Sequence, residues 1–286
     1  MKHKITIQGV AGCYHDAAAR DYFARIEPES EIETVECPSF GEMFSVLDTD
    51  PSLIGVVAIE NTIAGALLQN HELLRRSSLT VVGEYKMRIS HVLGAMNGQQ
   101  LSDIHEVHSH PMALMQCEQW LHRHPSIRMV EAFDTAGAAR SIAQTAQPGH
   151  AAVCSEYAAN LYGLNILEKG IETNKRNFTR FLILADPLLA DNLRPKDDLL
   201  NKASIVFTLP HTQGALSKVL SILSFYDMNL SKIQSMPIIG REWEYRFYID
   251  VTFDSYARYL QAIDAVRPLM SDFRSLGQYT QYENDQ

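Results

Sequence analysis

From residue 4 to about residue 185, short apolar runs alternate with segments of helical periodicity, and this alternation constrains the fold more than any other feature. The first part of it predicts strands over 4–8, 31–37 and 54–59, and helices over 14–26 and 40–49. A β-α-β-α-β succession of this kind is typical of an α/β domain with a largely parallel sheet.

The middle of the chain continues the rhythm with a different spacing. It predicts one or two strands over 80–95, helices over 111–122, 135–145 and 155–162, and strands over 129–133, 151–153 and 179–184. A long block between two ends of similar character indicates that the chain leaves one lobe, builds a second and returns. A ligand is then expected in a cleft between the lobes.

The rhythm breaks over 186–202, where prolines and aspartates replace apolar residues. We therefore expect a first domain over 1–186, a solvated linker over 187–201 and a second domain over 202–286. In the second domain we expect strands over 203–209, 229–237, 243–253 and 273–279, and helices over 214–226 and 255–270. This β-α-β-β-α-β order is ferredoxin-like.

Charge and cysteine usage narrow the class of protein. The chain has 34 acidic against 25 basic residues, a formal charge of −9, and no dense basic run, so nucleic acid and anionic membranes are not expected partners. The four cysteines are widely spaced and show no C-x-x-C pair, which indicates reduced thiols. With no signal-peptide pattern and no run of 18 apolar residues, we expect a cytoplasmic protein.

Two polar segments stand at the ends of predicted strands. Glu60, Asn61 and Thr62 follow the strand at 54–59, at the edge where α/β sheets usually bind ligands. Arg180 lies among apolar residues at the start of the strand at 179–184 and is suited to hold a carboxylate. The alternatives are ordinary ones: helix capping for the first segment, and a surface ion pair for the arginine.

Two further patterns carry weaker signals. The turn Gly9-Val10-Ala11-Gly12 lies between a strand and a helix, where glycines let backbone N–H groups approach an anion, although such a turn also needs glycine for steric reasons alone. His105, His108 and His110 are close in sequence, but no nearby cysteine or acidic pair completes a tetrahedral set. We therefore predict no metal site.

These segments together resemble prephenate dehydratases, over nearly the whole chain. The resemblance is carried by the segments already quoted and by 109–117, 134–139, 162–164 and the Asn-x-Thr-Arg-Phe signature at 177–181. The C-terminal part resembles the ACT domain of the same enzymes through 214–216, 229–233 and 243–245. The resemblance implies a two-lobed, type II periplasmic-binding-protein-like catalytic domain followed by a ferredoxin-like ACT domain.

The resemblance also implies the reaction, which is decarboxylative dehydration of prephenate to phenylpyruvate in phenylalanine biosynthesis, without a metal or organic cofactor. It implies catalytic roles for Thr179, Arg180 and Glu60. The residues that it implies for substrate binding are Asn61, Thr62, Ser109, Thr135, Asn177 and Phe181. The resemblance implies that Thr179 is the proton donor. Because an aliphatic hydroxyl is a very weak acid, the alternative is that Thr179 stabilises the departing oxygen by a hydrogen bond, and both roles stay open here.

Regulation by phenylalanine is the second implication. The effector residues that it implies are Gly214, Ala215, Leu216, Gln234 and Ser235. A homodimer or homotetramer through the ACT domains is implied as well. The chain departs from the family pattern at Gln213, Gln234 and Met236, which leaves the strength and sign of regulation open, and at His15, which is expected to be either a cationic donor or a solvent-facing residue.

Two rival functions stay open at this point. The substrate of a dehydratase of this kind can be arogenate, which has an amino group where prephenate has a ketone. A non-catalytic two-lobed solute sensor would bind a ligand without turnover. Formation of phenylalanine rather than phenylpyruvate would indicate the arogenate enzyme. Ligand binding without any product would indicate the sensor.

Overall fold

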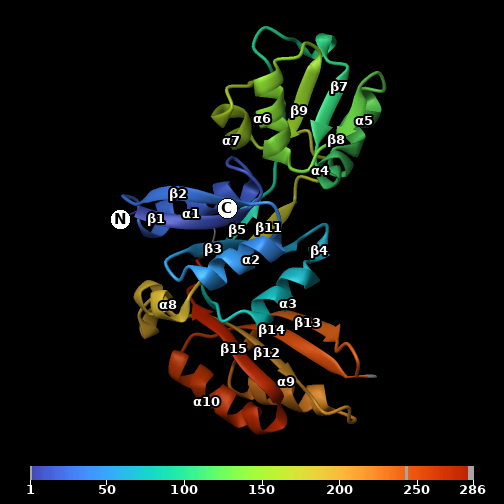
Figure 1. Ribbon diagram of the computed structural model, residues 1–286. Helices are drawn as coiled ribbons and strands as arrows, with labels where there is room; N and C mark the ends of the chain where they lie inside the picture. The colour runs from blue at the N-terminus through green and yellow to red at the C-terminus, as the bar shows by residue number, and fades with distance from the viewer. Residues whose placement is uncertain (1, 242–243, 283–286) are drawn as a thin grey trace. The chain divides into compact units, whose positions relative to one another are not determined.

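The computed structural model describes residues 2–241 and 244–282, and these residues form three sheets with flanking helices (Figure 1). The first sheet has the strand order β2-β1-β3-β11-β5, and β4 pairs with β3. Its strands are β1 (Lys2–Gln8), β2 (Glu31–Cys37), β3 (Ile54–Asn61), β4 (Gly65–Ala66), β5 (Thr80–Arg88) and β11 (Phe178–Ala185). The accompanying helices are α1 (Tyr14–Ile26), α2 (Phe40–Thr49) and α3 (Leu68–Arg76).

The second sheet is built entirely from the middle of the chain, in the order β10-β6-β9-β7-β8. Its strands are β6 (Val92–Ala95), β7 (Glu106–Ser109), β8 (Arg128–Glu131), β9 (His150–Cys154) and β10 (Asn165–Lys169). The helices are α4 (Pro111–Gln116), α5 (Glu118–Arg123), α6 (Thr135–Thr145) and α7 (Glu156–Leu161). Because β11 then joins the first sheet between β3 and β5, the chain does leave one sheet, build a second and return.

The third sheet has the order β13-β14-β12-β15 and is antiparallel. Its strands are β12 (Lys202–Thr208), β13 (Asn229–Pro237), β14 (Tyr245–Thr252) and β15 (Ser271–Tyr279), with helices α9 (Ala215–Phe225) and α10 (Tyr256–Val266). Apolar side chains of Ile205, Phe207, Val219, Ile249 and Tyr259 meet in its core. The observed order is β-α-β-β-α-β, as predicted. Position 243, where the third of these strands was predicted to begin, lies outside the described residues.

Several local predictions need correction. The segment 80–95, predicted as one or two strands, forms two, and these belong to different sheets. The helix predicted over 111–122 is two short helices, which meet at Cys117. The predicted linker contains a helix, α8 (Pro187–Leu193), whose first turn is capped by Asp186 Oδ1 accepting from the Leu188 N–H at 2.9 Å.

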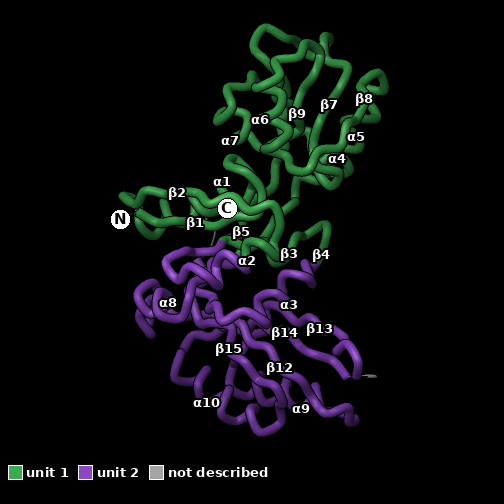
Figure 2. The backbone as a smooth tube through the Cα atoms, in the orientation of Figure 1, with its two compact units in different colours: residues 1–43, 56–65, 86–181 green, residues 44–55, 66–85, 182–286 purple. Residues whose placement is uncertain are grey.

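The chain divides into two compact units (Figure 2). The first unit contains residues 1–43, 56–65 and 86–181, and the second contains 44–55, 66–85 and 182–286. These limits differ from the predicted domains, since α3 and most of β5 group with the C-terminal sheet. None of the described helices has both the length and the apolar character needed to cross a bilayer.

Polar contacts inside the second unit explain this grouping. The Lys202 ammonium on β12 and the Glu84 carboxylate on β5 form a buried pair at 2.8 and 2.9 Å. The Arg274 guanidinium on β15 donates to the carbonyls of Arg75, Ser77 and Leu79 at the C-terminal end of α3. Hydrogen bonds and an ion pair therefore connect the third sheet to the C-terminal end of α3 and to β5 of the first sheet.

Candidate active site

The turn that follows β3 is organised by one amide side chain. Asn61 Oδ1 accepts from the N–H groups of Ile63 and Ala64 at 2.9 Å each, which is the local hydrogen bonding that makes asparagine a turn residue. Asn61 Nδ2 donates to Asn177 Oδ1 at 2.8 Å and to Thr179 Oγ1 at 2.9 Å. The same amide thus folds its own turn and holds the side chains at the start of β11.

A second hydroxyl residue fixes the same two segments through their backbones. Thr62 Oγ1 donates to the Arg176 carbonyl at 3.1 Å and accepts from the Phe178 N–H at 2.9 Å. The Thr62 N–H donates to the Phe178 carbonyl at 2.9 Å. Residues 60–64 and 176–181 therefore form one rigid frame, although more than a hundred positions separate them in the chain.

An ion pair lies in this frame. Arg180 Nε donates to Glu60 Oε1 at 2.6 Å, the short distance expected when both groups are charged. The arginine side chain is only 9% exposed, whereas Glu60 is 35% exposed. A mostly buried guanidinium beside a carboxylate places a fixed positive charge in the frame, and such a charge suits an anionic ligand.

Two donors in the frame lack a protein acceptor. The Thr179 hydroxyl accepts from Asn61 and, within the described residues, donates to no protein group, although the residue is only 8% exposed. Asn177 is fully buried, and its Nδ2 has no hydrogen-bond partner among the described residues. Because buried polar groups are almost always satisfied, these two donors indicate a place for an oxygen-rich ligand.

The other predicted site residues lie on the second sheet. The Ser109 hydroxyl, at the end of β7, donates to the Val153 carbonyl at 2.6 Å, so it offers a ligand its lone pairs rather than its proton. Thr135 is the first residue of α6, which Asp134 caps by accepting from the N–H groups of Ala136 and Gly137. The structure joins Glu60, Asn61, Thr62, Asn177, Thr179 and Arg180 by direct contacts, and Ser109 and Thr135 form a separate group.

The glycine turn contacts this second group. A Cβ atom on Gly9, which has a φ of +106°, would lie 2.5 Å from Asp134 Oδ2. The Tyr162 hydroxyl donates to the Ala11 carbonyl at 2.5 Å. The turn thus serves as a close-packing point between the first and second sheets. Sequence reasoning left Asp134 out of the site, although an aspartate just before a helix is a recognisable capping signal.

His15 and Phe181 belong to the packing behind the frame. The ring centroid of His15 lies 5.1 Å from that of Phe181 and 5.5 Å from that of Phe40, and its Nε2 accepts from the Ala58 N–H at 3.3 Å. Burial lowers the pKa of His15 to about 4, so the ring is neutral at pH 7. Neither expectation for His15, a cationic donor or a solvent-facing side chain, is met. Phe181 is 1% exposed and is a core residue.

The predicted effector residues lie on two elements of the third sheet. Gly214 has a φ of +77° and precedes α9, in which Ala215 and Leu216 form the first turn. Gln234 and Ser235 lie on β13, paired with Tyr248 and Phe247 of β14. The Gln234 side chain donates to the Ser235 carbonyl at 2.8 Å. The first group lies at the start of the helix that follows β12, and β14 separates β12 from β13, which carries the second group.

The geometry defines a class of protein before any comparison. A cationic guanidinium, an amide and a hydroxyl converge at the ends of two neighbouring strands of an α/β sheet, which suits a small carboxylic acid. The described residues include one group of side chains close enough to share a metal ion, His105, Glu106 and His150, and none of them belongs to this frame.

Comparison with known proteins identifies the family. The family model described as prephenate dehydratase matches residues 5–187. The bifunctional chorismate mutase/prephenate dehydratase of Escherichia coli is 34% identical over 278 residues, which is 96% of this chain and 70% of that protein. Arogenate dehydratase 5 of Arabidopsis thaliana is 37% identical over 295 residues, 96% of this chain and 67% of that protein. This chain therefore belongs to the prephenate dehydratase family.

Solved structures resemble this chain over nearly its whole length. A prephenate dehydratase from Arthrobacter aurescens in complex with L-Phe is 26% identical with a TM-score of 0.83, covering 97% of this chain and 90% of that one. A protein described as a novel type of quorum quenching acylase, GqqA, is 27% identical with the same TM-score of 0.83, covering 98% and 99%.

Proposed function

We propose that this chain converts prephenate to phenylpyruvate, with release of carbon dioxide and water. The observation that carries the proposal is the frame in which the Thr179 hydroxyl and the Asn177 amide have donors to offer beside the mostly buried positive charge of Arg180. Prephenate presents two carboxylates and a ring hydroxyl, so its oxygen acceptors match these donors. Positioning the dianion and assisting departure of the hydroxyl group are the two tasks of the site.

The steps balance without a cofactor. The carbon–carbon bond to the ring carboxylate breaks, carbon dioxide leaves, and the electron pair of that bond aromatises the ring. The carbon–oxygen bond to the ring hydroxyl breaks as well, and the departing hydroxyl group takes up one proton and leaves as water. The proton comes finally from solvent. Thr179 stabilises the departing oxygen by a hydrogen bond. Its hydroxyl proton is available for this bond because Asn61 donates to Thr179 Oγ1 and does not accept from it.

Each remaining residue of the frame has a supporting part in this proposal. Arg180 holds a carboxylate of the substrate while Glu60 orients the guanidinium, and Asn177 donates to a second oxygen. Asn61 and Thr62 fix the frame. Ser109 and Thr135 bind the substrate from the second sheet, and Phe181 acts through packing against His15.

We propose further that the first domain has the two-lobed, type II periplasmic-binding-protein-like catalytic fold, and that the C-terminal β-α-β-β-α-β domain is an ACT domain that binds phenylalanine. The relative from Arthrobacter aurescens, solved with L-Phe, supports this effector. The residues proposed to contact it are Gly214, Ala215, Leu216, Gln234 and Ser235. Titration calorimetry with phenylalanine tests the proposal, and no heat at millimolar phenylalanine would reject it. A homodimer or homotetramer through this domain and a cytoplasmic location complete the proposal; light scattering measures the first.

An acylase activity is a second candidate, because a structural relative carries that description. Amide hydrolysis by a protein nucleophile needs an activated hydroxyl or thiolate. Here Ser109 donates to a backbone carbonyl, and burial raises the pKa of Cys13, Cys117 and Cys154, with that of Cys117 and Cys154 reaching about 12. The Ser109 hydrogen bond and the raised thiol pKa values leave none of these four residues activated as a nucleophile, which favours the dehydratase over the acylase.

One experiment separates the candidates. The purified chain is incubated in parallel with prephenate, with arogenate and with an N-acyl amide, and the products are identified by chromatography. Phenylpyruvate from prephenate, lost in Thr179→Val, supports the proposal. Phenylalanine from arogenate alone would replace prephenate as the substrate, release of free acid from the amide would favour the acylase, and binding without any product would indicate a sensor.

A further inference from the structure

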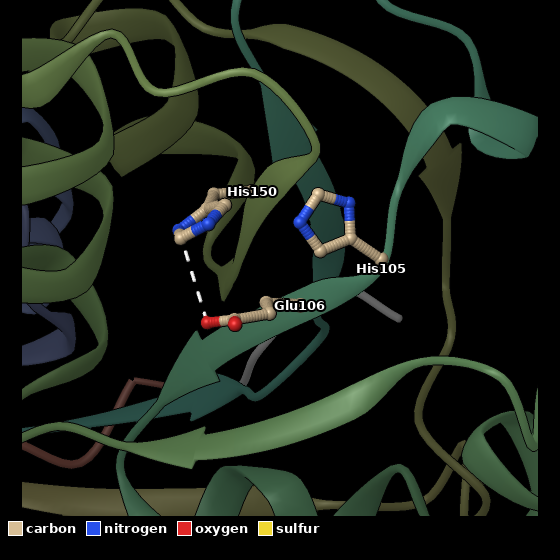
Figure 3. A group of neighbouring side chains, drawn as sticks. All are labelled: His105, Glu106 and His150. Carbon is tan, nitrogen blue, oxygen red and sulfur yellow. Dashed lines mark ion pairs between the residues drawn. The ribbon is translucent and has the colours of Figure 1, made fainter.

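Three side chains on the second sheet form a cluster that the dehydratase reaction does not use. His105, Glu106 and His150 each offer a ligand atom, and these atoms lie within 4.8 Å of one another (Figure 3). We call this group the imidazole–carboxylate cluster. His105 precedes β7, Glu106 begins that strand, and His150 begins β9, so residues more than forty positions apart meet where these two neighbouring strands begin.

The backbone fixes this meeting. Strands β7 and β9 are parallel, and Glu106 is the register partner of His150. The N–H groups of His105 and Glu106 both donate to the Gly149 carbonyl, at 2.9 and 3.1 Å. A Cβ atom on Gly149 would lie 1.9 Å from the His105 ring, so the ring lies directly against the Gly149 backbone.

The carboxylate of the cluster is divided between two partners. Glu106 Oε1 forms an ion pair with Arg128 on β8, and Oε2 lies 3.9 Å from His150 Nδ1 (Figure 3). A fourth side chain, His108, is adjacent, with its Nε2 3.2 Å from His150 Nδ1 and 3.4 Å from Glu106 Oε2. Arg128 thus anchors one oxygen and leaves the other facing imidazole nitrogens.

We propose that His105, Glu106 and His150 bind a divalent transition-metal ion of the zinc class. Two imidazoles and one carboxylate are a donor set that suits zinc and its neighbours, whereas magnesium and calcium prefer oxygen ligands alone. The cluster leaves a fourth position, which His108 or water fills. The ion bridges the starts of β7 and β9 and stabilises the pairing of these two strands there.

The cluster lies apart from the proposed catalytic residues. Ser109 stands at the opposite end of β7 from Glu106, three residues along the strand, which is roughly 10 Å. The metal therefore takes no part in the dehydration, and its binding is measured independently of turnover.

The experiment uses the full chain after removal of metals with a chelator. Zinc binding is measured by titration calorimetry, and cobalt binding by its visible absorption, whose intensity reports the coordination geometry. The variants are His105→Ala and His150→Gln. The control is His122→Ala, which removes an exposed histidine that also faces a carboxylate, Glu118, at 3.9 Å but outside the cluster.

We expect one zinc ion per chain, no displacement by a large excess of magnesium, and at least about tenfold weaker binding in each cluster variant. His122→Ala should bind as the wild type does. Absence of zinc binding, equal binding in His105→Ala, or an equal loss in the control would each overturn the proposal. If His150→Gln does not fold, the affinity of His105→Ala for zinc settles the question, because His105 is exposed and its replacement leaves the core intact.

Discussion

The side-chain amide of Asn61 donates to Oγ1 of Thr179 at 2.9 Å, from the end of one strand to the start of its neighbour. This contact uses a lone pair of the hydroxyl and leaves its proton for a substrate oxygen. The direction of that bond decides how the threonine can act, and it leads to the first prediction.

Thr179→Ser should keep most of the dehydratase activity, and Thr179→Val should lower kcat about 100-fold or more, because only valine lacks the donor. Phenylpyruvate formation followed by its alkaline absorbance measures both. Unchanged melting temperatures would show that the fold is intact. Equal kcat in the wild type and the valine variant would remove Thr179 from the mechanism.

Asn61→Asp should reduce activity strongly and cost about 1–3 kcal/mol in the free energy of unfolding, since an acceptor then faces Asn177 Oδ1 and Thr179 Oγ1. Urea denaturation gives the stability change. Asn192→Asp on the exposed face of α8 introduces the same charge without these contacts and serves as the control. A loss of similar size in the control would contradict this reading.

Arg180→Lys should lower kcat/KM by about tenfold to a hundredfold, mainly through KM, because the ammonium keeps the charge but loses the fork geometry and the Nε bond to Glu60. Steady-state kinetics with prephenate separate the two constants. Arg123→Lys, at an exposed position of α5, should leave both unchanged. A wild-type KM in Arg180→Lys would argue against a carboxylate clamp.

His15 should make the fold sensitive to mild acid. Its pKa is about 4 in the folded chain against an ordinary value of 6.5, so the unfolded chain binds more protons between these values. Stability from this group is therefore complete above about pH 6.5 and falls as the pH is lowered towards 4. His15→Gln keeps an acceptor for the Ala58 N–H but does not titrate, so its melting temperature should fall less between pH 7 and 5. Parallel curves would refute the assignment.

Lys202→Met should destabilise the chain by about 3–5 kcal/mol, because it removes the ammonium that faces the buried Glu84 carboxylate. The double variant Lys202→Met, Glu84→Gln should recover a large part of the loss. Denaturant unfolding of the two variants and the wild type forms the test. Additive losses would show that the two residues do not depend on each other.

The sequence predicts local elements well where the periodic pattern is strong, as in α1, α2 and α6, whose observed limits match the predicted ones. It does not show which strands pair, because pairing joins distant residues. Glu60 and Arg180 could be suspected separately, but only the insertion of β11 beside β3 places them 2.6 Å apart.

The same reason hides the imidazole–carboxylate cluster. Inspection of histidines close in sequence found no complete ligand set, whereas the fold supplies His150 from another strand and Glu106 from beside His105. The helix α8 was missed for a different reason. Asp186 followed by Pro187 is a typical helix start, but the surrounding prolines and aspartates favoured the prediction of a linker.

Gly277 on β15 lies so close to β5 that a Cβ atom there would be 2.1 Å from the Val81 carbonyl oxygen. Neither strand can yield to even one added methyl group without breaking its ladder. In a saturation library selected for growth without phenylalanine, this codon should tolerate no other amino acid, although it lies far along the chain from every residue proposed to touch the substrate. In a neutral drift experiment, glycine should therefore remain at position 277 in every selected variant, because β15 contacts β5 there.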